Sequence, residues 1–211
     1  GGQPAQLFAL VQSGVDAGRA TSVLLMKFIA YQSMVVINFI FALLIGFHYI
    51  ADKMHALSLL FIFGFVIHFC VIVGLLMVMY WYPFTRKLVK TVFKPVKWFI
   101  SAQKVERWET IIDEKIDNFY DESLRLKNDG KLLLKIVCLT LMQLAFYYLV
   151  PYFIILALGE KHISLLLVVT FHILIVMVIS LFPIPGGSGG AEYSFSVIFS
   201  IFITNSSKLV L

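Results

Sequence analysis

Residues 56–82 read ALSLLFIFGFVIHFCVIVGLLMVMYWY and contain no Lys, Arg, Asp or Glu. A run of about 20 apolar residues is enough for an α-helix to cross the hydrocarbon core of a bilayer. Three further predominantly apolar runs occupy residues 23–47, 132–158 and 163–182. Because these runs lack the alternation of polar and apolar residues that marks barrel strands, each of them indicates a spanning helix.

The composition agrees with a chain that lies largely in lipid. Its 211 residues are 60% hydrophobic and 14% charged, with a mean hydropathy of +0.92. Soluble domains are about 45–50% apolar and about 25% charged, so a soluble globular fold is excluded. We therefore predict an all-α integral membrane protein, a polytopic helical bundle built as a single domain over residues 1–211.

The two ends of the chain carry weaker signals. A fifth apolar run, 191–211, is interrupted by Asn205, Ser206, Ser207 and Lys208. This run either crosses the membrane or re-enters it as a shorter helix. The chain starts without Met or a signal peptide and stops within an apolar pattern, so we expect it to be a piece of a longer protein.

The basic residues predict the orientation in the membrane. Of the 17 Lys and Arg residues, most lie in the segment 83–131 and the first turns of the span that follows it, whereas the short loops 46–56 and 159–163 hold one Lys each. Loops rich in Lys and Arg stay on the cytoplasmic side. We therefore expect segment 83–131 in the cytoplasm.

Segment 83–131 is also the only stretch with the composition of a soluble protein. Apolar residues recur in it at helical spacing, from Val105 to Leu124, with charged residues between them. This pattern predicts an amphipathic helix, and the Asn128-Asp129-Gly130 turn is expected to end it. The helix is either a solvated connection or a surface attracted to anionic lipid through four basic residues, Lys87, Lys90, Lys94 and Lys97.

The densest signal for a site is FPIPGGSGGAE at 182–192. Pro183 and Pro185 end the fourth span, and a new helix is expected to start near Ala191 with free N–H groups facing the break. The candidate ligands for a lipid phosphate are the residues of the break: Gly186, Gly187, Ser188, Gly189 and Gly190. Glu192 is either a carboxylate favoured by the helix dipole or a partner for a cationic headgroup. The alternative for the whole stretch is a flexible turn at the membrane surface.

A second break precedes the first span. Gly1, Gly2 and Gln3 precede a half-length helix over residues 4–12, with Pro4 in its first turn. Arg19 is either a cytoplasmic anchor or a phosphate ligand, and Asp16 either belongs to the same site or only caps the helix that follows. Two interrupted elements of this kind are typical of transporters, with a binding site between them.

Polar residues inside the spans complete the candidates. The amides are expected to form hydrogen bonds between helices: Gln32, Asn38 and Gln143. His68 and His172 are better interpreted as helix contacts than as metal ligands. Pro151 is expected to kink the third span, and Lys27 to reach back to the interface.

No cofactor, metal or nucleic-acid partner is indicated. The sequence contains neither a Ser/His/Asp catalytic set nor a metal cluster or haem ligand pair. Cys70 and Cys138 lie inside apolar runs, and we expect both to be small hydrophobic core residues.

Several of these motifs together resemble the lysylphosphatidylglycerol synthase transmembrane family, the membrane domains of bacterial multiple peptide resistance factors and their stand-alone relatives. The resemblance lies in four motifs: Gly1-Gly2-Gln3-Pro4, Gly18-Arg19-Ala20-Thr21-Ser22, Gln143-x-x-x-Tyr147-Tyr148-x-x-Pro151 and Pro183-x-Pro185-Gly186-Gly187-x-Gly189-x-x-Glu192. It covers nearly the whole chain, and the last motif is its most specific part.

The resemblance implies a function at the bacterial cell membrane. Membrane domains of this family are thought to move aminoacylated phosphatidylglycerol to the outer leaflet, which protects the cell against cationic antimicrobial peptides. The implied partner is therefore phosphatidylglycerol or its lysyl ester, and association with further copies of the chain stays open. In full-length members a separate soluble domain transfers lysine to the lipid, and the 211 residues contain no counterpart of it.

Three functions follow from the sequence. The first is translocation of an aminoacyl-phospholipid, with Glu192 binding the ammonium and with Arg19 and the glycine break binding the phosphate. The second is the membrane half of a phosphatidylglycerol lysyltransferase whose catalytic domain lies elsewhere. The third is a membrane scaffold that holds partner enzymes through the amphipathic helix.

Overall fold

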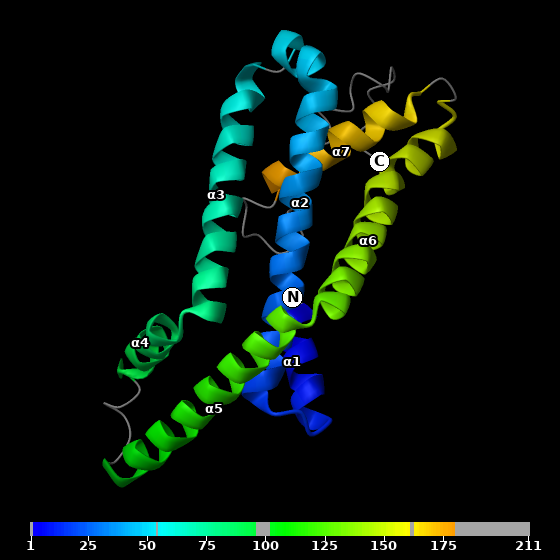
Figure 1. Ribbon diagram of the computed structural model, residues 1–211. Helices are drawn as coiled ribbons and strands as arrows, with labels where there is room; N and C mark the ends of the chain where they lie inside the picture. The colour runs from blue at the N-terminus through cyan, green and yellow to red at the C-terminus, as the bar shows by residue number, and fades with distance from the viewer. Residues whose placement is uncertain (1, 54, 96–101, 161–162, 180–211) are drawn as a thin grey trace. The chain divides into compact units, whose positions relative to one another are not determined.

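The computed structural model describes residues 2–53, 55–95, 102–160 and 163–179, and within these ranges it is helical without strands (Figure 1). The described helices are α1 (Gly2–Gln12), α2 (Ala17–Lys53), α3 (His55–Tyr80), α4 (Tyr82–Phe93), α5 (Ala102–Asn128), α6 (Gly130–Ala157) and α7 (Leu165–Ile179). The last expected run, 191–211, lies outside the described residues.

Three of the described helices are long and apolar enough to cross a membrane. Their spanning segments are Ala17–Gly46, Phe61–Tyr80 and Gly130–Ala157, and Leu165–Met177 is a shorter apolar helix. An all-α membrane fold is therefore confirmed.

Side-chain caps determine where two of these helices begin. The Oδ1 atom of Asp16 accepts hydrogen bonds from the N–H groups of Gly18, at 2.9 Å, and Arg19, at 3.3 Å. An N-cap of this kind satisfies N–H groups that have no partner inside the helix, so α2 begins at Ala17, and the interpretation of Asp16 as a helix cap is confirmed. Asp129 caps α6 in the same way, accepting the Leu132 N–H at 2.9 Å.

The amphipathic segment consists of two helices, where the sequence predicted one. Trp81 has φ −107° and ψ 83°, which is not helical, and it separates α3 from α4. Pro83 follows in the first turn of α4, where the missing N–H of a proline costs no hydrogen bond. Helix α4 thus begins directly at the end of a spanning helix, and α5 is the longer helix that the sequence pattern indicated.

The described chain divides into two compact units. The first unit comprises residues 1–31 and 71–137, and the second comprises 32–70 and 138–211. Helices α2, α3 and α6 each contribute residues to both units.

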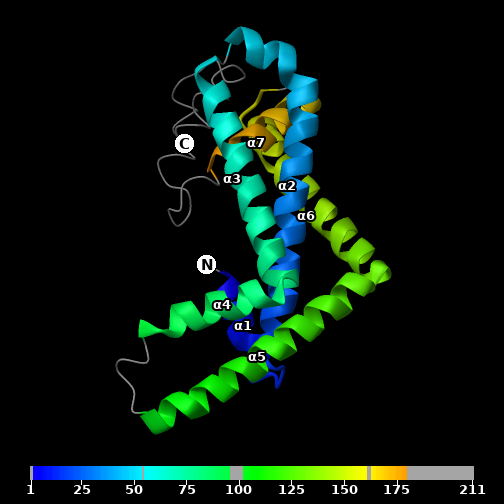
Figure 2. The same cartoon turned by 60° about the vertical axis from the view of Figure 1, so that its left-hand side comes forward.

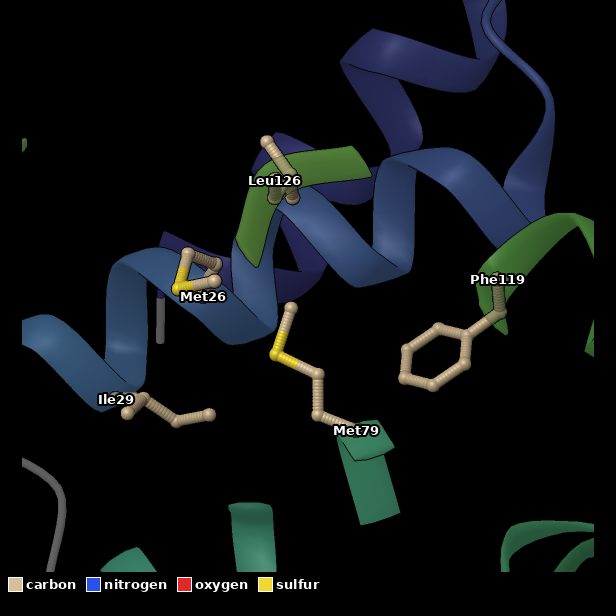
Figure 3. Close-up of a cluster of buried hydrophobic side chains, with 5 residues drawn as sticks. All are labelled: Met26, Ile29, Met79, Phe119 and Leu126. Atoms are coloured by element: carbon tan, nitrogen blue, oxygen red, sulfur yellow. The ribbon is translucent and has the colours of Figure 1, made fainter. Parts of the chain in front are cut away.

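The first unit has a small hydrophobic core where α2, α3 and α5 meet. Five buried side chains form it (Figure 3): Met26, Ile29, Met79, Phe119 and Leu126. Figure 2 shows α4 and α5 running alongside each other away from this core. The unit therefore joins the ends of two spanning helices to the amphipathic pair.

The second unit is centred on α7. Its residues from Thr170 to Met177 are all buried, and Leu144 and Ile155 of α6 are almost completely buried as well. The rings of Phe39 and Phe61 pack with centroids 6.1 Å apart.

Cys70 and Cys138 do not belong to either core. Both are free thiols on exposed positions, so the expectation that they are buried is wrong. An apolar residue on a spanning helix can face lipid as favourably as it faces a core, and hydrophobicity alone does not separate the two.

Candidate functional site

The glycine break that carried most of the sequence argument lies outside the described residues. This applies to Pro183, Pro185, Glu192 and the residues between the second proline and Ala191, and also to Gly1. The described part contains the remaining candidates, Gly2, Gln3, Arg19 and Pro151.

Helices α1 and α2 form an antiparallel hairpin. Gly14 has a φ of +87° in the turn between them, a conformation that favours glycine. Further along, Lys27 Nζ donates a hydrogen bond to Gln6 Oε1 at 3.1 Å. The side chain of Lys27 is thus bound to α1, an interaction that the sequence did not reveal.

This hairpin separates two groups of candidate residues. Arg19 lies next to the turn and is exposed, whereas Gly2 and Gln3 lie one turn beyond Gln6, at the other end. Arg19 and Lys27 are about 12 Å apart along the axis of α2 at 1.5 Å per residue. Arg19 and the Gly2-Gln3 pair are therefore at opposite ends of the hairpin.

Asp16 joins α2 to α5 in the first unit. Besides capping α2, its carboxylate forms an ion pair with Lys115 Nζ. Burial raises the pKa of Asp16, but hydrogen bonds from Lys115 and from the N–H groups of Arg19 and Gly18 outweigh it and leave the pKa below its ordinary value. The same pairing raises the pKa of Lys115, so both groups are charged at neutral pH.

Close packing of α2 on α5 follows from two small residues. A Cβ atom on Gly18 would overlap the carbonyl oxygen of Lys115 and lie 3.1 Å from the Phe119 nitrogen. One turn later, the hydroxyls of Ser22 and Ser123 are 2.8 Å apart and buried. Ser123 donates its proton to the Phe119 carbonyl at 2.8 Å, so Ser22 is the donor between the two hydroxyls.

A polar seam holds α4 against α5. Tyr82 donates to the Asp117 carboxylate at 2.6 Å, and the Asp113 carboxylate binds Arg86 at 3.0 Å and Lys90 at 3.1 Å. Burial raises the pKa of Asp113, but the two cations outweigh it and lower that pKa. The contacts run backward along α5 as they run forward along α4, so the two helices are antiparallel.

Beside this seam, the first unit contains an apolar groove of about 340 Å³. Residues of four helices line it: Ala17, Gly18, Thr21, Val78, Thr85, Val89, Phe93, Trp108, Ile111, Ile112, Lys115, Ile116 and Phe119. Lys115 is the only charged residue among them, and its amine is paired with Asp16. The groove suits an aliphatic ligand.

The second unit contains a cavity of about 410 Å³ that is lined by residues of α2, α6 and α7. Its lining combines two residues with polar side chains, Asn38 and Tyr148, with five apolar residues: Leu141, Ala145, Leu149, Val169 and Ile173. A few polar groups on an otherwise apolar wall are typical of ligand pockets.

A histidine lies next to this cavity. His172 Nδ1 is 3.3 Å from the Tyr148 carbonyl oxygen, and its ring packs against Tyr147 with centroids 5.1 Å apart. The sequence interpretation of His172 as a helix contact is thereby confirmed. Pro151 is buried inside α6. Because proline has no N–H group, residue 151 cannot donate the usual helical hydrogen bond to the Tyr147 carbonyl.

The described residues contain no group of three or more His, Cys, Asp or Glu side chains that could hold a metal ion. Among the cavities of the described residues are the apolar groove of the first unit and the cavity of the second unit, which is lined by Asn38, Tyr148 and apolar residues.

Comparison with known proteins identifies the family. The sequence model described as the lysylphosphatidylglycerol synthase TM region matches residues 1–211. The chain belongs to the lysylphosphatidylglycerol synthase transmembrane family. No curated protein and no solved structure gives a significant match to the chain.

Membership in the lysylphosphatidylglycerol synthase transmembrane family makes the chain a membrane domain of this family. The sequence analysis did not predict either of the two cavities described above. Lys115 was the available signal for the groove, because it is one charge in the apolar stripe of α5. For the cavity of the second unit, the signal was Asn38 within an apolar run.

Proposed function

We propose that this domain translocates an aminoacyl-phospholipid, lysylphosphatidylglycerol or a close analogue, to the outer leaflet of the bacterial plasma membrane. The positive charge of such a lipid lowers the attraction of the surface for cationic antimicrobial peptides, so translocation contributes to resistance. Membership in the family supports a lipid of this class.

The observation that carries the proposal is the cavity of the second unit, whose lining includes Asn38 and Tyr148. A lipid headgroup that crosses bare hydrocarbon loses its hydration, at a cost of several kcal/mol for each unpaired polar group. Asn38 and Tyr148 are two polar residues in the lining of a cavity between apolar helices, where polar residues are rare and mark substrate paths. A headgroup passing there exchanges water for protein partners.

The residues of the break supply the rest of the proposed site. Glu192 pairs with the ammonium group of the lysyl headgroup, and the backbone N–H groups from Gly186 to Gly190 bind its phosphate. Arg19 is proposed as a second phosphate ligand. Since Gly2 and Gln3 lie at the far end of the α1–α2 hairpin, they serve a different part of the lipid or of its path.

The proposed orientation follows the distribution of basic residues. It places α4 and α5 in the cytoplasm, next to the leaflet in which the lipid is made. The lipid then moves from the cytoplasmic leaflet to the outer leaflet.

The second candidate is the membrane half of a phosphatidylglycerol lysyltransferase, and the description of the family as a synthase region favours it. In this role the domain presents phosphatidylglycerol to a catalytic domain. The two candidates differ in one measurable quantity, the total amount of lysyl-lipid that the cell makes.

The test uses bacteria that depend on the full-length protein. Glu192→Gln keeps the size of the side chain and removes its charge. We expect it to lower the lysyl-lipid that an impermeant amine reagent labels at the cell surface, while total lysyl-lipid stays constant. Unchanged surface labelling would refute the role of Glu192, and a parallel loss of total lysyl-lipid would favour the lysyltransferase candidate.

A further inference from the structure

The groove of the first unit is formed by one face of each amphipathic helix. On α4 its lining residues follow one another at intervals of four: Thr85, Val89 and Phe93. On α5 they recur at intervals of three and four: Trp108, Ile111, Ile112, Lys115, Ile116 and Phe119. Such spacing places each set on one side of its helix, so the groove runs lengthwise between two apolar stripes.

The inner end of the groove lies at the level where the spanning helices end. Ala17, Gly18 and Thr21 contribute from the first turns of the segment Ala17–Gly46, and Val78 contributes from the end of the segment Phe61–Tyr80. The groove therefore opens at the boundary between hydrocarbon and headgroups, where a lipid presents both a chain and a phosphate.

Apolar side chains in and beside the groove are exposed. Val92 of α4 and Ile111 of α5 are 63% and 43% exposed, and the Trp108 ring is 47% exposed. A helix such as α4, with an exposed apolar face and basic polar residues, lies in the membrane interface, and Trp is enriched there. The surroundings of the groove are thus lipid rather than water.

The basic residues of α4 favour a lipid whose headgroup carries a net negative charge. The helix contains Arg86, Lys87 and Lys90 without any acidic residue, and Lys94 follows at its end. Asp113 binds Arg86 and Lys90, whereas Lys87 and Lys94 are exposed side chains. A basic helix beside an apolar groove complements a headgroup with a net negative charge.

We propose that the groove between α4 and α5 holds one acyl chain of an acidic phospholipid, whose phosphate is attracted by the lysines of α4. This lipid is a resident of the first unit, distinct from the lipid that is translocated, and the proposal does not rest on the proposed function. A volume of about 340 Å³ lies within the range of natural ligand pockets, about 300–1,000 Å³.

Fluorescence of Trp108 provides a direct test, because this ring lines the groove. The chain has three tryptophans, so Trp81→Phe and Trp98→Phe in the full-length protein leave Trp108 as its sole emitter within residues 1–211. The protein is placed in vesicles containing increasing fractions of lipid with brominated chains, which quench on contact. One series uses brominated phosphatidylglycerol and the other brominated phosphatidylcholine.

We expect half-maximal quenching at a clearly lower fraction of the acidic lipid. Each lysine near an anionic surface contributes about 1 kcal/mol, a factor of about five, so Lys87→Glu and Lys94→Glu, which also add a negative charge, should each reduce the preference by more than about fivefold. Lys131→Glu reverses the charge of another exposed lysine, on α6, and serves as the control. It should leave most of the preference intact.

Filling the groove tests the acyl chain separately from the charge. Val89→Phe adds a ring inside the groove and should weaken quenching by both lipids, whereas Val92→Phe adds the same volume outside the lining and should not. Thr21→Leu fills the inner end from α2 and repeats the test if Val89→Phe does not fold. Equal quenching by the two lipids at every fraction, or equal effects of the groove-filling variants and Val92→Phe, would overturn the proposal.

Discussion

Asp16 caps the first spanning helix and, with the same carboxylate, forms an ion pair with Lys115 of the amphipathic helix α5. The two residues are far apart in the sequence, and their contact fixes the start of α2 against the middle of α5. Beside this contact lie the close approach at Gly18 and one end of the apolar groove. Substitutions here test whether the first unit is held together as described.

Asp16→Ala should destabilise the protein by about 1–2 kcal/mol, of which about 1 kcal/mol reflects the lost cap. Asp16→Asn should cost less, because Asn caps as well as Asp and a partly exposed ion pair contributes only about 0–1 kcal/mol. The midpoint of thermal unfolding in detergent measures both. Glu114→Gln, which changes an exposed neighbour of Lys115, is the control. Equal stability of Asp16→Ala and wild type would contradict the capping role.

Acidification should weaken the first unit. The pKa values of Asp16 and Asp113 are lower in the folded protein than in the unfolded chain. Their contribution to stability is therefore present above the unfolded pKa of about 3.9, and it is lost as the pH falls through the lower folded values. Unfolding midpoints between neutral pH and about pH 3 measure this loss. The variant Asp16→Asn/Asp113→Asn should show a shallower decline, and an unchanged slope would contradict the assignment.

Gly18→Ala should separate α2 from α5. The added methyl group overlaps the backbone of Lys115, and relieving such an overlap typically costs about 1–3 kcal/mol. Gly74→Ala is a matched control, because Gly74 also lies inside a helix but has open space around its Cβ position. It should be neutral or stabilising by up to about 1 kcal/mol. The shifts of the thermal unfolding midpoint relative to wild type should therefore differ in sign, or clearly in size, between the two variants.

The buried pair Ser22 and Ser123 allows a double-mutant cycle. Ser123→Ala leaves the Ser22 hydroxyl without its acceptor in a buried position, which costs about 1–3 kcal/mol. Ser22→Ala/Ser123→Ala removes both groups and should recover part of that loss, giving a coupling of about 0.5 kcal/mol or more. Ser13→Ala, at an exposed hydroxyl bonded within its own helix turn, is the control. Strict additivity would show that the two hydroxyls do not interact.

The sequence was sufficient for the membrane fold and for most of its helices. Apolar runs of spanning length predicted the spanning helices, and the helical spacing from Val105 to Leu124 predicted α5. Both signals are local, since they depend on residues a few positions apart.

Contacts between residues that are distant in the sequence could not be predicted from local patterns. Nothing near Asp16 indicates that it pairs with Lys115, and nothing near Ser22 indicates Ser123 as its partner. The error on Cys70 and Cys138 has a related cause, because in a membrane the lipid-facing and core-facing residues are equally apolar. For the cavity of the second unit, the sequence indicated Asn38 as a single amide in an apolar run. It did not indicate that Asn38 and Tyr148 line the same cavity.

The most direct test of lipid translocation compares two amide substitutions in proteoliposomes. The full-length protein is reconstituted with headgroup-labelled lysylphosphatidylglycerol in the inner leaflet, and an impermeant amine reagent outside reports its appearance. Asn38→Leu removes an amide from the cavity, and Gln143→Leu removes an exposed one from the same unit. If the Asn38 amide lowers the free-energy barrier to headgroup passage by about 1.4 kcal/mol, Asn38→Leu should slow the appearance of labelled lipid outside about tenfold. Gln143→Leu should keep the wild-type rate. Exposure by the folded wild-type protein no faster than in protein-free vesicles would contradict translocation, and equal slowing by both variants would contradict the role of the cavity.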